Sequence, residues 1–337
     1  MISVVIPCRN EEKHIANCVD AIYQSKFDSQ TELEVLVVDG LSDDGTLEVL
    51  KTLCKKYPTL RVIKNEKQVA PVAFNLGIQE SQGEFVQIVG ARQIISENYL
   101  EGAKRTLVEM EDVWCVGGAV ENIYENDASL FIGLAMASPF GVGGSNFRAL
   151  KKSTYTDTIG TPMYRKSTFD KIGLFDDSLV RNQDDELNYR LTKAGGKIYL
   201  NADILIKYYV RASFGKLFRQ YFQYGYWKVF VGKKHKAFTN IRQLIPLIFV
   251  LGLIFGAVLS LIIPNFWYLY TLGLALYTMG ALMFGMKAAK QDAGKGFNVA
   301  IVFPVLHISY GWGYLRGIID FFILQKNPNE KSKALTR

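Results

Sequence analysis

Two long uncharged apolar runs in the last third constrain this 337-residue chain more than any other feature. The runs cover residues 244–263 and 266–286 and are separated only by Pro264 and Asn265. As helices, both are long enough to cross a hydrocarbon core of about 30 Å. A soluble protein has no comparable layer that could bury two such helices on every face. The runs therefore predict a membrane hairpin rather than two core helices.

A third apolar segment, 297–324, is interrupted by Pro304 and His307 and is expected to be embedded in the membrane. Basic residues flank the hairpin: Lys228, Lys233, Lys234, Lys236, Arg242, Lys287, Lys290 and Lys295. Because basic flanks stay in the cytoplasm, we expect both hairpin ends there and the Pro264–Asn265 turn outside. The basic tail 326–337 is also expected inside. The third segment is then either re-entrant or interfacial, or the basic tail is an exception to the rule that basic flanks stay in the cytoplasm.

The charges divide the chain into two parts. Residues 205–337 carry 17 Lys and Arg against 3 Asp and Glu, or +14, which leaves 22 against 29, or −7, for residues 1–204. With 49% apolar residues and only four cysteines, the composition excludes a disordered chain and a disulfide scaffold. No signal peptide is expected, so the acidic part should be cytoplasmic. The expected divisions are a catalytic domain 1–206, a basic and aromatic juxtamembrane segment 207–243, a membrane region 244–325 and a basic tail 326–337.

Short apolar runs alternate with helical stretches in the first part. The expected strands are 2–6, 33–38, 60–63 and 85–89, and the expected helices are 11–25, 46–57 and 70–81. This alternation predicts an α/β fold, with a mostly parallel, doubly wound sheet and helices on both faces. Ligands of such sheets bind at the carboxyl ends of the strands.

Two polar loops, 7–12 and 39–46, follow the first two expected strands. A carboxylate such as that of Asp39 can accept the N3–H of a pyrimidine base, and a Gly/Ser/Asp loop lets backbone donors approach a ribose or phosphate. Capping of the next helix is an equally good interpretation for Ser42, Asp43 and Asp44. The chain has neither G-x-G-x-x-G nor the P-loop motif, which argues against a dinucleotide oxidoreductase and a P-loop nucleotidase.

Three ordered motifs resemble a known family: SVVIPCRNEE from residue 3, LVVDGLSDDGT from residue 36 and NLGIQESQGEFV from residue 75. They are similar to the nucleotide-binding half of the family 2 inverting glycosyltransferases. Across residues 1–230, the further motifs VGGSNFR, NQDDELNYR and RASFGKLFRQYFQYGYWK resemble the bacterial exopolysaccharide branch that includes succinoglycan glucosyltransferases.

The resemblance implies a GT-A-like (Rossmann-like) catalytic domain followed by an all-α transmembrane region. It also implies an inverting hexosyltransferase of exopolysaccharide biosynthesis, with a nucleotide sugar as donor and a UDP-sugar expected. The expected acceptor is a polyprenyl-diphosphate-linked or other lipid-linked saccharide, and the expected location is the bacterial inner membrane, with several passes and a cytoplasmic catalytic domain.

The resemblance also implies site residues. Pro7, Arg9, Glu11 and Asp39 would contact the donor, and Ser42 lies in the same loop. The family's general base is the Asp of an E-D-x-[DE]-L pattern, which corresponds to Asp184 here, with Gln183 in place of Glu and Asp185 as second choice. One base must take the acceptor hydroxyl's proton. A surface cap on a helix is the alternative for this acidic cluster.

The family's metal-binding D-x-D is replaced by Gly90-Ala91-Arg92. Three alternatives remain for the diphosphate. Arg92 can neutralise it directly, since a guanidinium binds phosphate through two parallel hydrogen bonds, and the enzyme is then metal-independent. Other carboxylates can supply a Mg or Mn site. The chain can also be a catalytically impaired, glycosyltransferase-like membrane scaffold or partner subunit.

Basic and aromatic residues mix just before the hairpin. Arg211, Gln223 and Trp227 are expected on the acceptor and lipid side. Such mixtures also bind nucleic acid, but ahead of an apolar hairpin they predict the headgroup level of a membrane, so no nucleic-acid partner is expected. A transporter is disfavoured because the membrane segments offer few intramembrane charges.

Overall fold

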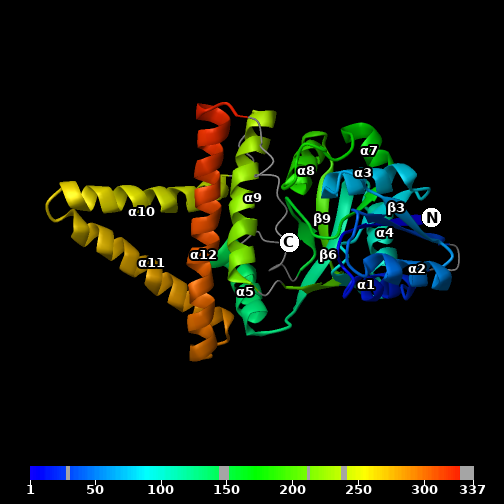
Figure 1. The fold of residues 1–337 in the computed structure, drawn as a ribbon, viewed down its shortest axis with the longest axis horizontal. Helices are drawn as coiled ribbons and strands as arrows, with labels where there is room; N and C mark the ends of the chain where they lie inside the picture. The colour runs from blue at the N-terminus through cyan, green and yellow to red at the C-terminus, as the bar shows by residue number, and fades with distance from the viewer. Residues whose placement is uncertain (28–30, 144–151, 211–212, 237–240, 327–337) are drawn as a thin grey trace. The chain divides into compact units, whose positions relative to one another are not determined.

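The computed structural model describes residues 1–27, 31–143, 152–210, 213–236 and 241–326. The chain forms two compact units (Figure 1). The first consists of Met1–Ile123 and Leu150–Tyr209, and the second of Tyr124–Ala149 and Val210–Arg337. Residues 124–149, which the sequence placed within the domain 1–206, therefore belong with the C-terminal helices.

Within the described residues, the first unit holds a nine-stranded mixed sheet in the order β3-β2-β1-β4-β8-β6-β9-β5, with β7 paired to β9. The strands are β1 (Ile2–Cys8), β2 (Leu33–Asp39), β3 (Leu60–Lys64), β4 (Phe85–Ile88), β5 (Gln93–Ile95), β6 (Val113–Ile123), β7 (Thr154–Tyr155), β8 (Met163–Arg165) and β9 (Lys197–Tyr209). The first four are parallel, as predicted. Because β8 is antiparallel to both β4 and β6, and β9 is parallel to β6, β9 runs in the same direction as β1.

Helices cover both faces of this sheet (Figure 1). They are α1 (Ile15–Tyr23), α2 (Thr46–Lys56), α3 (Ala70–Glu80), α4 (Tyr99–Glu109), α7 (Ser167–Ile172) and α8 (Gln183–Lys193). Side chains of α1, α2 and α4 join one core cluster with Val4, Ile6, Val35 and Val37. On the other face α3 lies so close to β1 that a Cβ on Gly77 would collide with Val5. The predicted α/β class and its covered sheet are confirmed.

The first helix starts later than predicted. Residues 12–14 form a turn rather than part of the helix expected from residue 11, and the Glu11 backbone N–H donates to Thr46 Oγ1 at 2.8 Å. Asn10 adopts a left-handed conformation with φ 55°. The strand end and the helix are therefore joined by a loop that faces the next strand connection.

The second unit is helical in its described residues. It contains α5 (Asp127–Ala137), α6 (Pro139–Val142), α9 (Phe214–His235), α10 (Ile245–Ile262), α11 (Phe266–Ala288) and α12 (Ala293–Ile318), with a 3₁₀ turn at Ile241–Leu244 and a π turn at Ile319–Ile323. The two predicted hairpin helices are α10 and α11, and the predicted third segment is α12. His307 of α12 lies 2.8 Å from both the Tyr277 hydroxyl and the Phe140 carbonyl, which ties α11 and α6 to α12.

Helices α9 and α12 run parallel and pack backbone to backbone. A Cβ on Gly313 would collide with the Phe222 carbonyl, and one on Gly317 would lie 2.8 Å from the Tyr226 carbonyl. Glycines allow such close approach because they have no side chain. Beyond the last glycine contact, Lys233 Nζ donates to the Phe321 carbonyl at 2.6 Å, so the carboxyl ends of both helices meet.

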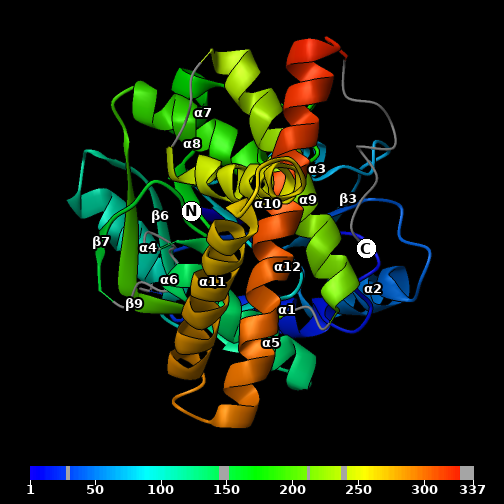
Figure 2. The same cartoon turned by 90° about the vertical axis from the view of Figure 1, so that its left-hand side faces the viewer.

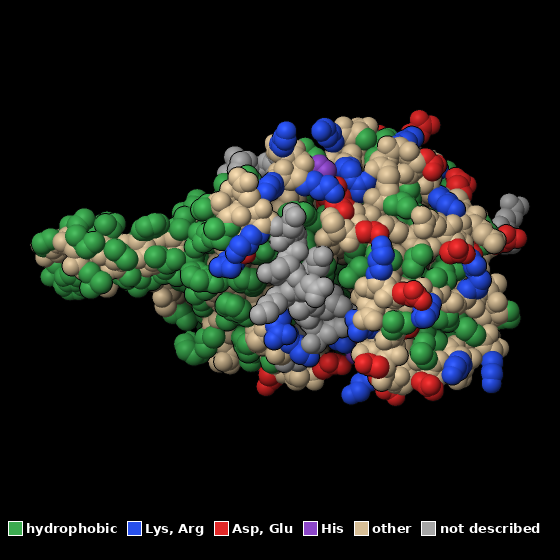
Figure 3. Space-filling model, turned by 45° about the horizontal axis from the view of Figure 1, so that its top comes forward, with side chains coloured by type: hydrophobic (Ala, Val, Ile, Leu, Met, Phe, Trp, Pro, Cys, Tyr) green, Lys and Arg blue, Asp and Glu red, His purple; other side chains and the backbone are tan. Residues whose placement is uncertain are grey.

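The α10–α11 hairpin exposes many large apolar side chains, and hydrophobic residues cover its visible face in Figure 3. Among the described residues, α10 and α11 are the two helices long and apolar enough to cross a membrane, and only 11% of each apolar window is buried in the protein. Leu261 is 88% exposed and Ile262 is 69% exposed. An apolar surface of this extent needs an apolar environment outside the chain.

Candidate active site

The loops at the carboxyl ends of β1, β2 and β4 lie next to one another. Cys8 pairs with Asp39 in the sheet register, and the Gly40 N–H donates to the Cys8 carbonyl at 2.8 Å. On the other side of β1, the Val89 N–H donates to the Val5 carbonyl at 3.0 Å. Residues 7–12, 39–46 and 89–92 therefore share one edge, where parallel sheets bind ligands.

Asp39 has an oriented and buried carboxylate. Its exposed fraction is 4%, and it accepts hydrogen bonds from the Ser42 N–H at 3.0 Å and the Ser42 hydroxyl at 2.5 Å. The Ser42 oxygen in turn accepts from the Asn10 N–H at 2.9 Å. Two donors leave further lone pairs on the carboxylate, so it remains able to accept a bond from a ligand.

Gly45 is the N-cap residue of α2, and Asp44 rather than Ser42 contacts the first residue of the helix. Asp44 Oδ1 accepts from the Thr46 N–H at 2.9 Å and from the Thr46 hydroxyl at 2.5 Å. Burial opposes ionisation of Asp44, but the hydrogen bonds from Thr46 outweigh it and lower the pKa of this carboxyl. Asp43 instead exchanges two hydrogen bonds with Asn10, at 2.5 and 3.0 Å, and joins the two loops.

Arg92 forms an ion pair with Glu11. Its Nε donates to Glu11 Oε2 at 2.7 Å, with 10% of the Glu11 side chain and 39% of the Arg92 side chain exposed. The turn before it is held by the Gly90 N–H, which donates to Gln93 Oε1 at 2.6 Å. Nε is one of five guanidinium N–H donors, so four remain beyond the Glu11 contact. The two predicted donor residues therefore meet, and one orients the other.

Pro7 and Arg9 complete this edge. Pro7 pairs with Val38 in the sheet register. The Arg9 side chain passes close to Gly40, where a Cβ would lie 3.4 Å from Arg9 Cδ. Both residues therefore border the Asp39 loop.

The residues at the D-x-D position do not fit a divalent metal. Hard cations need oxygen ligands, and Gly90, Ala91 and Arg92 carry no side-chain oxygen. Nowhere in the described part of the chain do three His, Cys, Asp or Glu side chains gather as a candidate metal site. The positive charge at this position belongs to Arg92.

Asp184 and Asp185 lie in the first turn of α8, on a different element from the two loops. Asp184 is exposed, and its carboxylate accepts the Asp185 N–H at 2.9 Å. The helix is anchored by Glu186, which is 1% exposed and binds Arg190 through both oxygens at 2.8 and 2.7 Å. Burial raises the pKa of Tyr164 on β8, and the charge of Asp184 adds to the shift, so Asp184 lies within electrostatic reach of β8.

The three residues predicted on the acceptor and lipid side fall in the second unit along the chain. Arg211 lies outside the described residues. Gln223 and Trp227 belong to α9 of the helical unit, with exposed fractions of 6% and 0%. The Trp227 ring makes an edge contact with Phe230 at 5.7 Å, so it is part of a packed aromatic cluster.

Thr161 is a residue that the sequence pattern did not single out. It is a β-branched residue with φ 55°, it is 4% exposed, and its hydroxyl has no protein partner in the described residues. Its carbonyl accepts from the Tyr99 hydroxyl at 2.7 Å, and the next carbonyl, of Pro162, accepts from Ile88 at the end of β4. Such strain is characteristic of functional sites. In the sequence, only the flanking Gly160 and Pro162 point to an unusual backbone conformation at this position.

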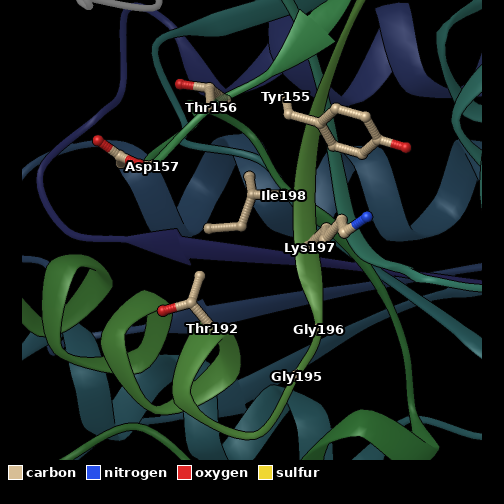
Figure 4. Close-up of a pocket in the computed structure, with 8 residues that line it drawn as sticks. All are labelled: Tyr155, Thr156, Asp157, Thr192, Gly195, Gly196, Lys197 and Ile198. Carbon is tan, nitrogen blue, oxygen red and sulfur yellow. The ribbon is translucent and has the colours of Figure 1, made fainter.

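A pocket of about 390 Å³ lies at the opposite edge of the sheet (Figure 4). It is lined by residues around Lys197 and by Tyr155 and Thr192. Lys197 begins β9 and pairs with Val113, the first residue of β6. Both are amino ends of strands parallel to β1, so this pocket is separate from the candidate site.

Comparison with known proteins identifies the fold and the family. Residues 3–173, about half of the chain, match the model of Glycosyl transferase family 2. The chain belongs to glycosyl transferase family 2. Its assignment as a glycosyltransferase confirms the resemblance carried by the sequence motifs.

Two relatives match this family 2 enzyme over nearly its whole length. A dolichyl N-acetyl-alpha-D-glucosaminyl phosphate 3-beta-D-2,3-diacetamido-2,3-dideoxy-beta-D-glucuronosyltransferase of Methanococcus voltae is 30% identical, with 94% of this chain and 97% of the relative covered. The succinoglycan biosynthesis protein ExoA of Rhizobium meliloti is 28% identical, with 94% and 95% covered.

Two solved structures share the fold. Residues 1–349 of S. aureus TarS, in complex with UDP-GlcNAc, align with a TM-score of 0.50 and 21% identity over 63% of this chain and 59% of that chain. GalNAc-T7 with UDP, GalNAc and Mn²⁺ aligns with a TM-score of 0.52 and 15% identity over 63% and 44%. Both alignments are consistent with the mixed sheet described above.

Proposed function

We propose that this chain is a membrane-anchored, inverting glycosyltransferase that moves a sugar from a nucleotide donor, with UDP-sugar as the expected donor, to a lipid-linked saccharide. The observation that carries the proposal is that an oriented carboxylate, Asp39 at the end of β2, and an oriented cation, Arg92 in the loop after β4, follow the two strands that flank β1. A uridine base needs an acceptor for its N3–H, and a diphosphate needs a cation.

Asp39 and Arg92 have separate tasks in donor binding. Ser42 holds the Asp39 carboxylate in place for the base, and Pro7 and Arg9 border the same loop. Glu11 holds Arg92 through Nε, so its two Nη groups can form parallel hydrogen bonds with the diphosphate. In this assignment Glu11 is a positioning residue, and Arg92 stabilises the charge of the leaving group without a metal.

Asp184 is assigned as the general base, with Asp185 as the alternative. The acceptor hydroxyl oxygen attacks the anomeric carbon and forms the new glycosidic bond, while the hydroxyl proton passes to the carboxylate. The bond between the anomeric carbon and the diphosphate oxygen breaks, and its electron pair leaves with the nucleoside diphosphate. A single displacement of this kind inverts the configuration at that carbon.

The acceptor class rests on the apolar hairpin and on the relatives. One relative is named for transfer to a dolichyl phosphate-linked sugar, and the other for succinoglycan biosynthesis. Helices α10 and α11 would anchor the enzyme in the cell membrane, with the basic flanks and the catalytic unit on the cytoplasmic side. The enzyme would then meet its lipid-linked acceptor at the inner leaflet.

A transfer assay tests this function. Full-length protein in detergent is incubated with undecaprenyl-diphosphate-linked saccharide and a panel of nucleotide sugars. Asp184→Asn is expected to lower kcat by about 10²–10⁴-fold, the usual contribution of a general base, and to leave UDP affinity unchanged. Asp170→Asn on α7 is the matched control and should transfer at the wild-type rate.

The same assay separates the enzyme from the scaffold alternative. If every donor gave neither transfer nor hydrolysis, the enzymatic assignment would be refuted. If UDP still bound to such an inactive protein, the replacement of the D-x-D would indicate a nucleotide-binding partner subunit.

A further inference from the structure

Helix α12 exposes one narrow apolar stripe. Phe297, Ile301 and Trp312 are 57%, 45% and 48% exposed, whereas Val302, Phe303 and Leu306 are buried. At 100° per residue the three exposed side chains fall within about 60° of one another around the helix. If α12 crossed a membrane at the edge of the molecule, this stripe would contact lipid through the full thickness of the hydrocarbon core.

Basic residues lie at both ends of α12. Lys287, Lys290 and Lys295 surround its amino end, and all three are exposed. At its carboxyl end lie Arg316 and Lys326, together with the last turn of α9, which holds Lys233, Lys234 and His235. Asp292 forms an ion pair with Lys295, and Asp320 with Arg316. Residues 287–326 hold five Lys and Arg against two Asp and no Glu, so this part of the chain keeps a net positive charge.

The hairpin meets α12 at two points. A Cβ on Gly311 would collide with the Pro246 carbonyl in the first turn of α10, and one on Gly285 near the end of α11 would collide with the Gly296 carbonyl. The two contact points on α12 are 15 residues apart, or about 22 Å at 1.5 Å per residue.

These two contact points constrain the direction of α12. The first turn of α10 and the last turns of α11 are the two bases of one hairpin with a short tip, so both bases lie on the same side of the membrane. If α12 ran along the membrane normal, its contact points would differ in depth by about 22 Å, most of a 30 Å hydrocarbon core. They lie at similar depth only if α12 runs along the surface. Figure 1 shows α10 crosswise to α12, and Figure 2 shows α10 nearly end-on while α12 still runs from top to bottom.

We propose that α12 is an interfacial helix that lies in the plane of one leaflet, and that the basic residues at its two ends bind phospholipid headgroups of that leaflet. Its stripe of Phe297, Ile301 and Trp312 enters the acyl boundary. The inference rests on the proposed membrane anchor. It selects the interfacial alternative for the third segment and keeps Lys326, after α12, on the same side of the membrane as the two bases of the hairpin.

Single-cysteine labelling of the full chain in cells tests the proposal. Cys54 is replaced by serine, because the other three native cysteines are buried. A membrane-impermeant maleimide is then applied to Lys51→Cys in the catalytic unit, Pro264→Cys at the hairpin tip, and Gly294→Cys and Lys326→Cys at the two ends of α12. The expected result is labelling of position 264 in intact cells, and of the other three positions only after permeabilisation.

The possible outcomes separate the two proposals. Labelling of positions 294 and 326 from opposite sides would overturn the interfacial helix and leave the anchor intact. A chain extracted from membranes by alkaline carbonate would refute the anchor itself. A spin label on Ile301→Cys should be more accessible to oxygen than to a water-soluble nickel chelate, with a label on Lys51→Cys as the exposed control. The reverse order at position 301 would remove α12 from the lipid and overturn the inference.

Discussion

Replacing Arg92 by glutamine is expected to weaken the binding of UDP without any metal present. The guanidinium keeps four N–H donors for the diphosphate after its Nε is bound to Glu11. A hydrogen bond to a charged group contributes about 1.5–3 kcal/mol. Because 39% of the Arg92 side chain is exposed, solvent screening favours the lower end, about 1.5–2 kcal/mol. The loss corresponds to a Kd about 10–30-fold higher.

Titration calorimetry with UDP in EDTA, and again with Mn²⁺, measures this loss on full-length protein. Arg105→Gln is the matched control, since its side chain is 68% exposed on α4 and only forms a long surface pair. Its Kd should equal that of the wild type. Glu11→Gln should weaken binding less than Arg92→Gln, because it removes the orientation of the cation but not the cation.

Two results would refute this reasoning. One is a Kd for UDP that is the same in the wild type and in Arg92→Gln. The other is binding that is absent in EDTA and is restored by Mn²⁺ equally in wild type and Arg92→Gln, which would show that a metal held by other carboxylates neutralises the diphosphate.

Three further predictions concern stability and are measured by thermal or urea unfolding in detergent. Tyr99→Phe should cost about 1–3 kcal/mol, because the Gly118 N–H loses its partner in the buried sheet; an unchanged midpoint would contradict this. Gly313→Ala should cost about 1–3 kcal/mol by forcing α9 from α12, while Gly252→Ala, in open space, should not destabilise the protein; equal effects would contradict close packing. Burial opposes the ionisation of Glu34, but hydrogen bonds lower its pKa, so its stabilisation is present above its usual pKa and is lost as the pH falls through the lowered pKa. Glu34→Gln should therefore flatten the melting curve against pH between 5 and 3, and an unchanged slope would argue otherwise.

The parallel part of the sheet, β1 to β4, was predictable because its signals are local. The first four strands and two of the three helices between them start at the predicted residues, since buried parallel strands are continuous apolar runs. The Asp39 loop was predictable as well, because polar residues after a strand end must lie at the carboxyl edge. The resemblance of the motifs added the candidate base, Asp184.

The remaining features depend on contacts that the sequence does not encode locally. Glu11 and Arg92 are separated by 81 positions, and only the pairing of β1 with β4 brings them together. The left-handed conformation of Thr161 runs against its residue type and is held by tertiary hydrogen bonds. From its sequence, the segment α5–α6 resembles an ordinary apolar helix. Its packing against α12 depends on distant partners such as His307.

The unequal legs of the α10–α11 hairpin have a consequence for the thickness of the bilayer it fits. Helix α10 has 18 residues and α11 has 23, so their lengths differ by about 7.5 Å. The shorter leg can stand upright in a hydrocarbon layer of about 27 Å, but the longer leg then has to tilt. In a thicker bilayer α11 can tilt less and keep its ends at the interfaces, whereas α10 has no extra length to span the added thickness. The short leg therefore sets the membrane thickness at which this hairpin is unstrained, and a thin bilayer suits it best.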